Sequence, residues 1–134
     1  MSNVSNDLIW ELTKGNSKYL VKFQGTVFSK DPLNVTHKNS KNSSGLANDK
    51  AVGVTEVDGK VVVSTKVAKN ANKPSKAVHV QKFNEYKAAR KLALAVSNTT
   101  KGYRDDLRVV AVKTASQYSR GKTARKSYPV KSRK

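Results

Sequence analysis

Apolar residues near the start of the chain recur with helical spacing. Between residues 6 and 14, Leu8, Ile9 and Leu12 share one helical face. A Gly-Asn pair follows directly and is a typical signal for the end of a helix. The pattern therefore predicts a short N-terminal helix.

The next apolar residues alternate with polar ones, which is the spacing of a strand with one exposed face. In residues 18–23 the apolar series is Tyr19, Val21 and Phe23, and a Gln-Gly pair then turns the chain. Residues 26–28 can return antiparallel to this strand. We therefore expect a half-buried hairpin here.

Two valine-rich runs give the clearest local signal in the chain. Residues 51–57 and 60–67 are separated by Asp58-Gly59, a pair that favours the type I′ turn of a two-residue hairpin. Together with the earlier strands, these runs predict one antiparallel sheet. The residues expected in its core are Val52, Val54, Val61, Val62 and Val63.

Two stretches lack any regular spacing. Residues 29–50 are rich in Asn, Ser and Lys and contain Pro32 and Gly45, so an ordered or semi-ordered loop is expected. Residues 66–76 contain several Lys residues and Pro74 but no apolar period, which indicates a basic linker.

Helical spacing returns after this linker. Between residues 81 and 97, Phe83, Tyr86, Ala93 and Val96 fall on a three-to-four-residue period, which predicts a helix ending near residue 97. A second helix is expected from Asp105 or Asp106 to Gly121, with the acidic pair as capping residues at its positive end. The apolar face of this second helix consists of Leu107, Val110, Ala111, Thr114, Ala115 and Tyr118.

These elements predict an α+β fold with a small antiparallel sheet, an N-terminal helix, two C-terminal helices and an extended basic tail. We expect a single domain over residues 1–120, since a chain of 134 residues has the length of one domain. Its 1–67 part is sheet-rich and nearly neutral, and its 77–120 part is basic and helical. The 121–134 tail lacks apolar residues with a period and cannot fold alone.

The charge indicates which class of partner to expect. The chain holds 27 Lys and Arg against 9 Asp and Glu, a formal net charge of +18 at pH 7. Residues 1–60 contain 8 basic and 6 acidic residues, a net of +2, whereas residues 61–134 contain 19 and 3, a net of +16. Such a field attracts polyanions. Nucleic acid is the leading candidate partner, and an anionic membrane surface is the second.

Other function classes lack the residues they need. Cysteine is absent, and His37 and His79 have no second ligand at metal-binding spacing. No glycine-rich phosphate-binding motif occurs, so no enzyme activity, cofactor, metal or small-molecule substrate is expected. Residues 1–10 lack the features of a secretory signal, and the longest apolar run, 92–96, falls well short of the roughly 20 residues of a membrane span. We expect a soluble intracellular protein that inserts into no membrane.

Basic residues recur along the predicted helices and tail without acidic residues to balance them. Lys and Arg can neutralise phosphates, and Tyr103 lies where it could stack on a base. The candidate RNA-binding residues are Lys38, Lys41, Lys82, Lys87, Arg90, Lys91, Lys101, Tyr103, Arg104, Arg108, Lys113, Arg120, Lys122, Arg125, Lys126, Lys131 and Arg133. Alternatives are a basic DNA- or chromatin-binding protein, although no zinc-finger, zipper or helix-turn-helix pattern occurs, and a peripheral membrane binder.

Three segments also carry a resemblance to a known family. They are Asn6-Asp7-Leu8-Ile9-Trp10, residues 45–54 and Gly102-Tyr103-Arg104-Asp105-Asp106-Leu107. In order and spacing they are similar to segments of the eukaryotic L28e family of large-subunit ribosomal proteins, over about residues 4–120. A nucleolar ribosome-assembly factor opens in a similar way, but it carries cysteines and a long acidic extension that are missing here.

The resemblance implies a structural constituent of the large (60S) ribosomal subunit, with no catalysis and no cofactor. Such a protein would bind ribosomal RNA and touch neighbouring ribosomal proteins in the cytoplasm, after assembly in the nucleus and nucleolus, and no homo-oligomer is expected. A ribosome-assembly factor is an alternative. The family usually has aromatic and Arg residues before Gly45, whereas residues 41–44 here are Lys-Asn-Ser-Ser, which leaves phosphate contacts from Lys38 and Lys41 as the expectation at this loop.

Overall fold

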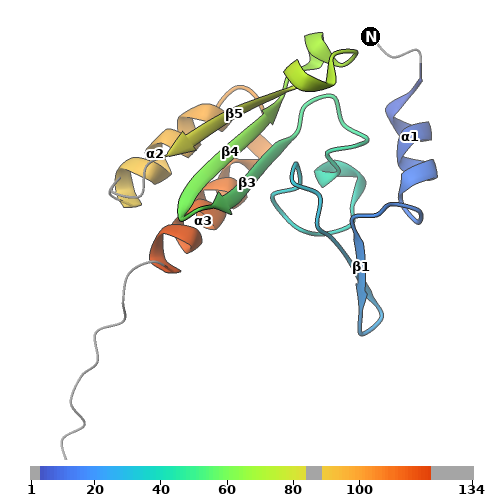
Figure 1. Cartoon of the computed structure of the whole chain (residues 1–134). Helices are drawn as coiled ribbons and strands as arrows, with labels where there is room; N and C mark the ends of the chain where they lie inside the picture. Colours follow the sequence, from blue (N-terminus) through green and yellow to red (C-terminus); the bar gives the residue numbers. More distant parts are fainter. Residues whose placement is uncertain (1–3, 84–88, 122–134) are drawn as a thin grey trace, which may run out of the picture.

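The computed structural model describes residues 4–83 and 89–121 and has the expected α+β architecture (Figure 1). Its elements in chain order are α1 (Asn6–Thr13), β1 (Leu20–Phe23), β2 (Thr26–Ser29), η1 (Lys41–Ser43), β3 (Val52–Val57), β4 (Lys60–Lys66), η2 (Ala68–Asn70), η3 (Pro74–Lys76), β5 (Val78–Phe83), α2 (Ala89–Thr100) and α3 (Asp105–Gly121). The N-terminal helix and the second C-terminal helix lie where the sequence predicts them. The predicted tail lies outside the described residues, apart from Gly121.

The hairpin of β3 and β4 is confirmed with its predicted turn. Val57 pairs with Lys60 across the turn, and Asp58 and Gly59 have φ angles of 50° and 73°, as a type I′ turn requires. All five valines that were expected in the core are buried. The sequence pattern is therefore reliable where alternation and turn chemistry agree.

The strands form two sheets, so the prediction of one sheet is wrong. β1 pairs with β2 alone, and the second sheet has the order β3-β4-β5. A period of two residues predicts that a strand exists but does not say which strand it pairs with. The first hairpin is also less buried than expected, because Phe23 is 61% exposed.

The third strand of the larger sheet, β5, is the main correction to the predicted elements. The predicted helix over residues 81–97 is wrong at its start, because Gln81 to Phe83 belong to β5, which pairs antiparallel with β4. This pairing satisfies the backbone groups along the second edge of β4, and that tertiary gain outweighs the local helical period. Tyr86 lies outside the described residues, and α2 continues to Thr100.

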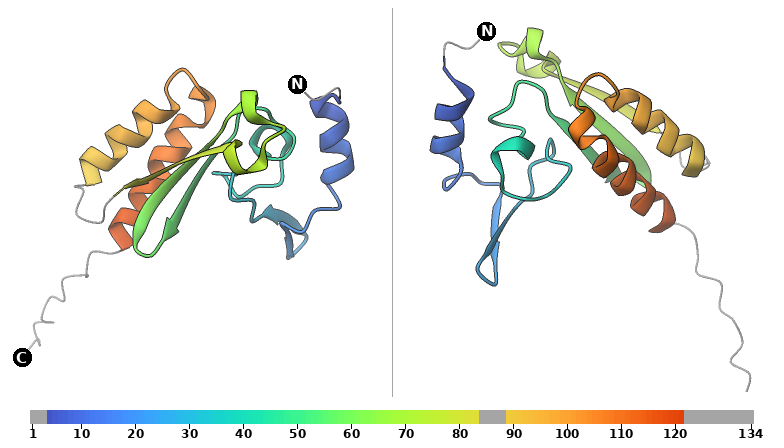
Figure 2. Two further views of the ribbon diagram at one scale, coloured as in Figure 1. Left: turned by 45° about the horizontal axis from the view of Figure 1, so that its top comes forward. Right: turned by 180° about the vertical axis from the view of Figure 1, so that it is seen from behind.

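Both C-terminal helices cover the same face of the three-stranded sheet (Figures 1 and 2). Ala111 and Ala115 are fully buried, and their small side chains let α3 lie close to the strands. The core that results joins Val35, Val52, Val54, Val61 and Val63 to Leu92, Val96, Leu107, Ala111 and Ala115. This core holds α2 and α3 in a fixed position, with their outer faces toward solvent.

The N-terminal helix and the first hairpin lie beyond β3, away from α2 (Figure 1). Ser5 caps α1 by accepting a hydrogen bond from the Leu8 amide, but no residue of α1 is buried. Leu8 and Leu12 are 51% and 65% exposed, so the predicted apolar face exists without a cover among the described residues. In the described part of the chain, no helix has the length and apolar character that crossing a membrane requires.

Side chains order the long loop between β2 and β3. Asp31 accepts hydrogen bonds from the amides of Leu33 and Gly45, over 2.9 and 3.1 Å. The Asn48 amide group donates to the carbonyls of Lys41 and Ser44. The expected loop is therefore an ordered one, built from polar residues that bond their own backbone.

Candidate nucleic-acid interface

The turn between α2 and α3 carries Arg104, which is anchored to the protein itself. Its guanidinium forms a two-point pair with the Asp106 carboxylate, over 2.8 Å from Nε and 2.7 Å from Nη2. It also donates to the carbonyls of Lys50 and Asn42, each over 2.8 Å. The side chain is 14% exposed. Arg104 thus fastens the long loop to the helix pair.

This ion pair shifts the pKa of both partners. The hydrogen bonds from Arg104 lower the pKa of Asp106 from 3.8 to about 2, and an amide hydrogen bond from Asn42 acts in the same direction. The carboxylate in turn raises the pKa of Arg104. Asp105 accepts a hydrogen bond from the Gly102 amide, so both acids have structural partners at the start of α3, where capping was expected.

Tyr103 is likewise engaged with the protein. Its hydroxyl accepts a hydrogen bond from the Ala51 amide over 3.2 Å and donates to the Lys66 carbonyl. The ring packs against the core, and the Lys50 ammonium lies 5.7 Å from its centroid. Burial raises the pKa of the Tyr103 hydroxyl. Stacking of this ring on a base stays a prediction.

Lys66 is an anchoring residue that the sequence analysis missed, because it was counted with the basic linker. Its ammonium donates to the carbonyls of Gly45 and Asn48, over 3.0 and 2.8 Å. Lys66 ends β4, whereas its two acceptors lie in the long loop. Since only the tertiary fold brings these carbonyls to β4, no local sequence signal could have identified this role.

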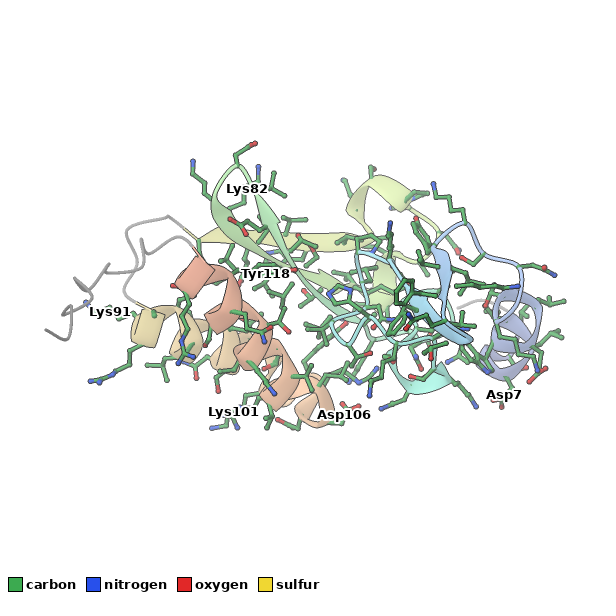
Figure 3. The ribbon with its side chains drawn as sticks, turned by 90° about the horizontal axis from the view of Figure 1, so that it is seen from below. Asp7, Lys82, Lys91, Lys101, Asp106 and Tyr118 are labelled. Carbon is green, nitrogen blue, oxygen red and sulfur yellow. The ribbon has the colours of Figure 1, made fainter. Side chains whose placement is uncertain are left out.

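The outer faces of α2 and α3 and the turn between them carry a group of exposed cations. We call this set the helix-pair cations; all its members are exposed, and none lies within ion-pair distance of a described carboxylate. Figure 3 shows Lys91 and Lys101 at opposite ends of α2. The set comprises Arg90, Lys91, Lys101, Lys113 and Arg120.

Arg108 belongs to the same helices but lies between them. It is half-buried, and its Nε donates to the Ser97 hydroxyl over 2.7 Å, which joins α3 to α2. Among the predicted RNA-binding residues of α2, α3 and their connecting turn, the structure thus separates exposed cations from those that hold the fold together.

Three other predicted residues lie apart from this set. Lys82 alternates with Gln81 and Phe83 on β5 and projects from the sheet face opposite the helices, which places it across the molecule from Lys101 in Figure 3. Lys41 forms an ion pair with Asp7 of α1. Lys38 is exposed in the long loop.

The remaining predicted residues fall outside the described part of the chain. They are Lys87, Lys122, Arg125, Lys126, Lys131 and Arg133. Within residues 4–83 and 89–121, no three His, Asp or Glu side chains gather as a metal site would require.

A groove of about 450 Å³ opens between the long loop and α3, and we call it the α3 groove. Lys38 lines one wall, and Lys113, Gln117 and Tyr118 line the other. By sequence, the two lysines are candidate RNA-binding residues and Tyr118 belongs to the apolar face of its helix, whereas Gln117 is not among the candidates. The i,i+4 spacing of Lys113 and Gln117 on an exposed helix face is the signal that could have linked them.

The sequence is similar to proteins of one known family. The sequence model of the Ribosomal L28e protein family matches residues 8–121. A large ribosomal subunit protein eL28 of Schizosaccharomyces pombe is 41% identical over 122 residues, covering 85% of this chain and 90% of that protein. A protein of the same name from Dictyostelium discoideum is 36% identical over 109 residues, covering 81% of this chain and 82% of its own.

The family match spans both sheets, both C-terminal helices and the turn that carries Tyr103 and Arg104. The matched family is one of structural ribosomal proteins and not of enzymes. The chain belongs to the Ribosomal L28e protein family.

Proposed function

We propose that this protein is a structural constituent of the large subunit of eukaryotic ribosomes and that it holds ribosomal RNA through Lys and Arg contacts to phosphates. The observation that carries the proposal is the set of helix-pair cations, which are exposed and lack carboxylate partners in the described part. Cations left unpaired on a rigid surface are a strong attraction for a polyanion, because binding releases the counterions condensed on the phosphates.

The helix pair offers these cations on a preorganised support. α2 and α3 are fixed by the core beneath them and by the bond from Arg108 to Ser97, so the exposed ammonium and guanidinium groups need no backbone rearrangement to meet phosphates. Phosphate contacts position a protein on RNA without reading sequence. Specificity would then come from the shape of the folded RNA.

The anchored residues support the interface indirectly. Arg104, Tyr103 and Lys66 join the long loop to the helix pair, and this loop holds Lys38 and Lys41 in place. Loss of an anchor would therefore weaken RNA binding through misplacement of the loop. Lys82 would serve a second RNA segment, since it projects from the opposite sheet face.

Neighbouring ribosomal proteins are the second class of partner in this proposal. Leu8, Leu12 and Phe23 are each more than half exposed, and all three belong to the part of the fold that lies away from the helix-pair cations. Apolar side chains that a free domain leaves in water are typical of surfaces that become covered on assembly. We further propose that the protein acts in cytoplasmic ribosomes after assembly in the nucleolus.

Sucrose-gradient sedimentation of cell extract tests this function. A tagged full-length chain should co-sediment with the large subunit, remain there in high salt, and move to the top of the gradient after ribonuclease treatment. Sedimentation with nucleolar precursor particles alone would contradict the proposal in favour of an assembly factor. Association with chromatin instead of ribosomes would also overturn it.

Charge variants test which face carries the contacts. Replacing Lys101, Lys113 and Arg120 together by Gln should lower affinity for a large-subunit RNA fragment by about tenfold or more. Each lost phosphate contact means that fewer counterions are released when the protein binds RNA. A matched control replaces three other exposed lysines by Gln, so that the charge change is equal: Lys22, Lys30 and Lys60. Equal losses in both variants would indicate that net charge, and not this face, determines binding.

A further inference from the structure

We infer that the α3 groove is a binding site for a single unstacked nucleotide of an RNA strand. The inference rests on the proposed RNA-binding function and adds to it a defined subsite. The groove measures about 450 Å³, which lies within the range of roughly 300–1,000 Å³ typical of sites that enclose small organic ligands.

The positive charges around the groove favour the binding of an anionic ligand. Lys38 lies on the loop wall and Lys113 on the helix wall, and both are exposed. Neither ammonium lies within ion-pair distance of a carboxylate in the described part, and no Asp or Glu is among the described residues that line the groove. Two ammonium groups on opposite walls suit the phosphates on either side of one nucleotide.

The uncharged lining suits a base. Tyr118 contributes an aromatic ring that packs against the core on one side and borders the groove on the other, and Figure 3 shows it where α3 meets the rest of the domain. Gln117 supplies a side-chain amide that can both donate to and accept from the polar edge of a base. The Thr36 hydroxyl also lines the groove, but it already donates to the Asn34 side-chain oxygen and accepts from the Lys38 amide, so it serves to hold the loop wall. Aromatic stacking combined with edge hydrogen bonds is the usual way in which proteins bind unpaired RNA bases.

The loop wall of the groove is held rigidly before any ligand arrives. The Asn34 side chain is buried; its oxygen accepts hydrogen bonds from the amides of Thr36 and His37, and its nitrogen donates to the Lys38 carbonyl. His37 is in the left-handed region, with φ of 56°, and its carbonyl accepts from the Ser29 amide over 2.8 Å. The left-handed backbone conformation is unfavourable for residues other than glycine, and these hydrogen bonds stabilise it at His37.

A rigid loop wall favours binding, because less conformational entropy is lost when the ligand binds to a site that is already ordered. A duplex cannot use the groove in this way, since its bases are stacked and paired. The site therefore predicts a preference for single-stranded over double-stranded RNA that phosphate contacts alone would not give.

The test compares two nearly isosteric variants of the full chain that add the same negative charge. Gln117→Glu places a carboxylate in the groove, whereas Asn98→Asp places one on the exposed face of α2, outside it. The probes are a single-stranded uridine octamer and an RNA duplex with the same number of phosphates, each measured by fluorescence anisotropy at one salt concentration.

We expect Gln117→Glu to weaken octamer binding about tenfold more than Asn98→Asp does, and the two variants to bind the duplex with affinities within about twofold of each other. Equal effects of both variants on the octamer would overturn the nucleotide site while leaving the general phosphate interface intact. Failure of the wild-type chain to bind either RNA would instead contradict the proposed function. Thermal unfolding of both variants checks that each is folded.

A second measurement locates the ligand directly. Adenosine monophosphate titrated into the isotope-labelled chain should shift the amide resonances of His37, Lys38, Gln117 and Tyr118, whereas inorganic phosphate at the same concentration should shift them several-fold less. Shifts centred on other residues, or equal shifts from both probes, would contradict a site that holds a base.

Discussion

Basic side chains at and around the helix pair differ in what each one touches. Arg104 and Lys66 donate to backbone carbonyls of the long loop and so stabilise the fold. Lys101 and Lys113 are exposed on the helix pair and have no carboxylate within reach in the described part. Residue type alone does not separate the two roles, because each depends on tertiary neighbours.

The Tyr103 hydroxyl provides a direct test of an anchoring role. Tyr103→Phe should lower the free energy of unfolding by about 1–2 kcal/mol, because the Ala51 amide and the Lys66 carbonyl would each lose a partly buried hydrogen-bond partner. Urea denaturation measures this change. Tyr19→Phe is the matched control, since no hydrogen bond of the Tyr19 hydroxyl is found in the described part, and its effect should be much smaller.

The same variant separates packing from stacking at Tyr103. Phenylalanine keeps the aromatic ring, so RNA affinity of the folded variant should equal that of the wild type even though its stability falls. A large loss of RNA affinity without loss of stability would instead mean that the hydroxyl contacts RNA and that the bonds to Ala51 and Lys66 contribute little.

The ion pair between Arg104 and Asp106 makes stability depend on pH. The pKa of Asp106 is about 2 in the folded chain and 3.8 is its ordinary value, so the folded state favours the charged carboxylate. The resulting stabilisation is present above pH 4 and is lost as the pH falls from about 4 to 2. Solvent screening limits its size to about 1 kcal/mol, because the Asp106 side chain is 44% exposed.

Asp106→Asn should therefore lower stability at pH 7 by about 1 kcal/mol and lose most of this difference by pH 2, where about half of the folded wild-type carboxylate is protonated. Chemical denaturation at a series of pH values measures the difference between the two proteins. A difference that stayed constant down to pH 2 would show that the ion pair is not its source. Asp58→Asn, in the exposed hairpin turn, controls for a general effect of charge.

At the level of elements, the long loop and β3 approach each other closely at Gly53. A Cβ atom on Gly53 would lie 1.8 Å from the Pro32 carbonyl oxygen, far inside van der Waals contact. This approach lets the loop cover the face of β3 that points away from the helices. Glycine is required here for space and not for its backbone freedom.

Gly53→Ala should destabilise the protein by about 3 kcal/mol, because two backbone segments must move apart to admit a methyl group. Gly15→Ala is the matched control, since a Cβ at Gly15 meets no atom within 4 Å. Thermal and urea unfolding of both variants measure the contrast. Near-equal stability of the two variants would contradict the close approach.

The elements also show how far sequence reasoning extends. The β3–β4 hairpin and α3 were predictable because turn chemistry, capping and periodicity agree within one short segment. β5 was not predictable, because Gln81 to Phe83 fit a helical period as well as an alternating one. The strand forms because these residues can pair with the second edge of β4. That the first hairpin forms a sheet of its own could not be predicted either, since local patterns do not encode strand pairing.

In the whole molecule, the boundary between the neutral and the basic part of the sequence does not coincide with the boundary between sheet and helices. The near-neutral first 60 residues supply three of the five strands, β1, β2 and β3, whereas β4 and β5 lie almost entirely in the basic half and complete the larger sheet. The exposed cations were predictable as a set from the excess of Lys and Arg. The α3 groove was not, because it is formed by Lys38 and Lys113, which are far apart in the sequence.

Residues 122–134 contain six Lys and Arg and no acidic residue. If all six meet phosphates, deletion of this segment should reduce the slope of log affinity against log salt by about 4 to 5, at about 0.7–0.9 per contact. The unfolding midpoint should stay unchanged, because the segment has no apolar period with which to join a core. A chain in which these six residues are replaced by Gln separates charge from length. Equal slopes for the wild-type and truncated chains would place the contacts on the helix pair alone, whereas a lower unfolding midpoint would make the segment part of the fold.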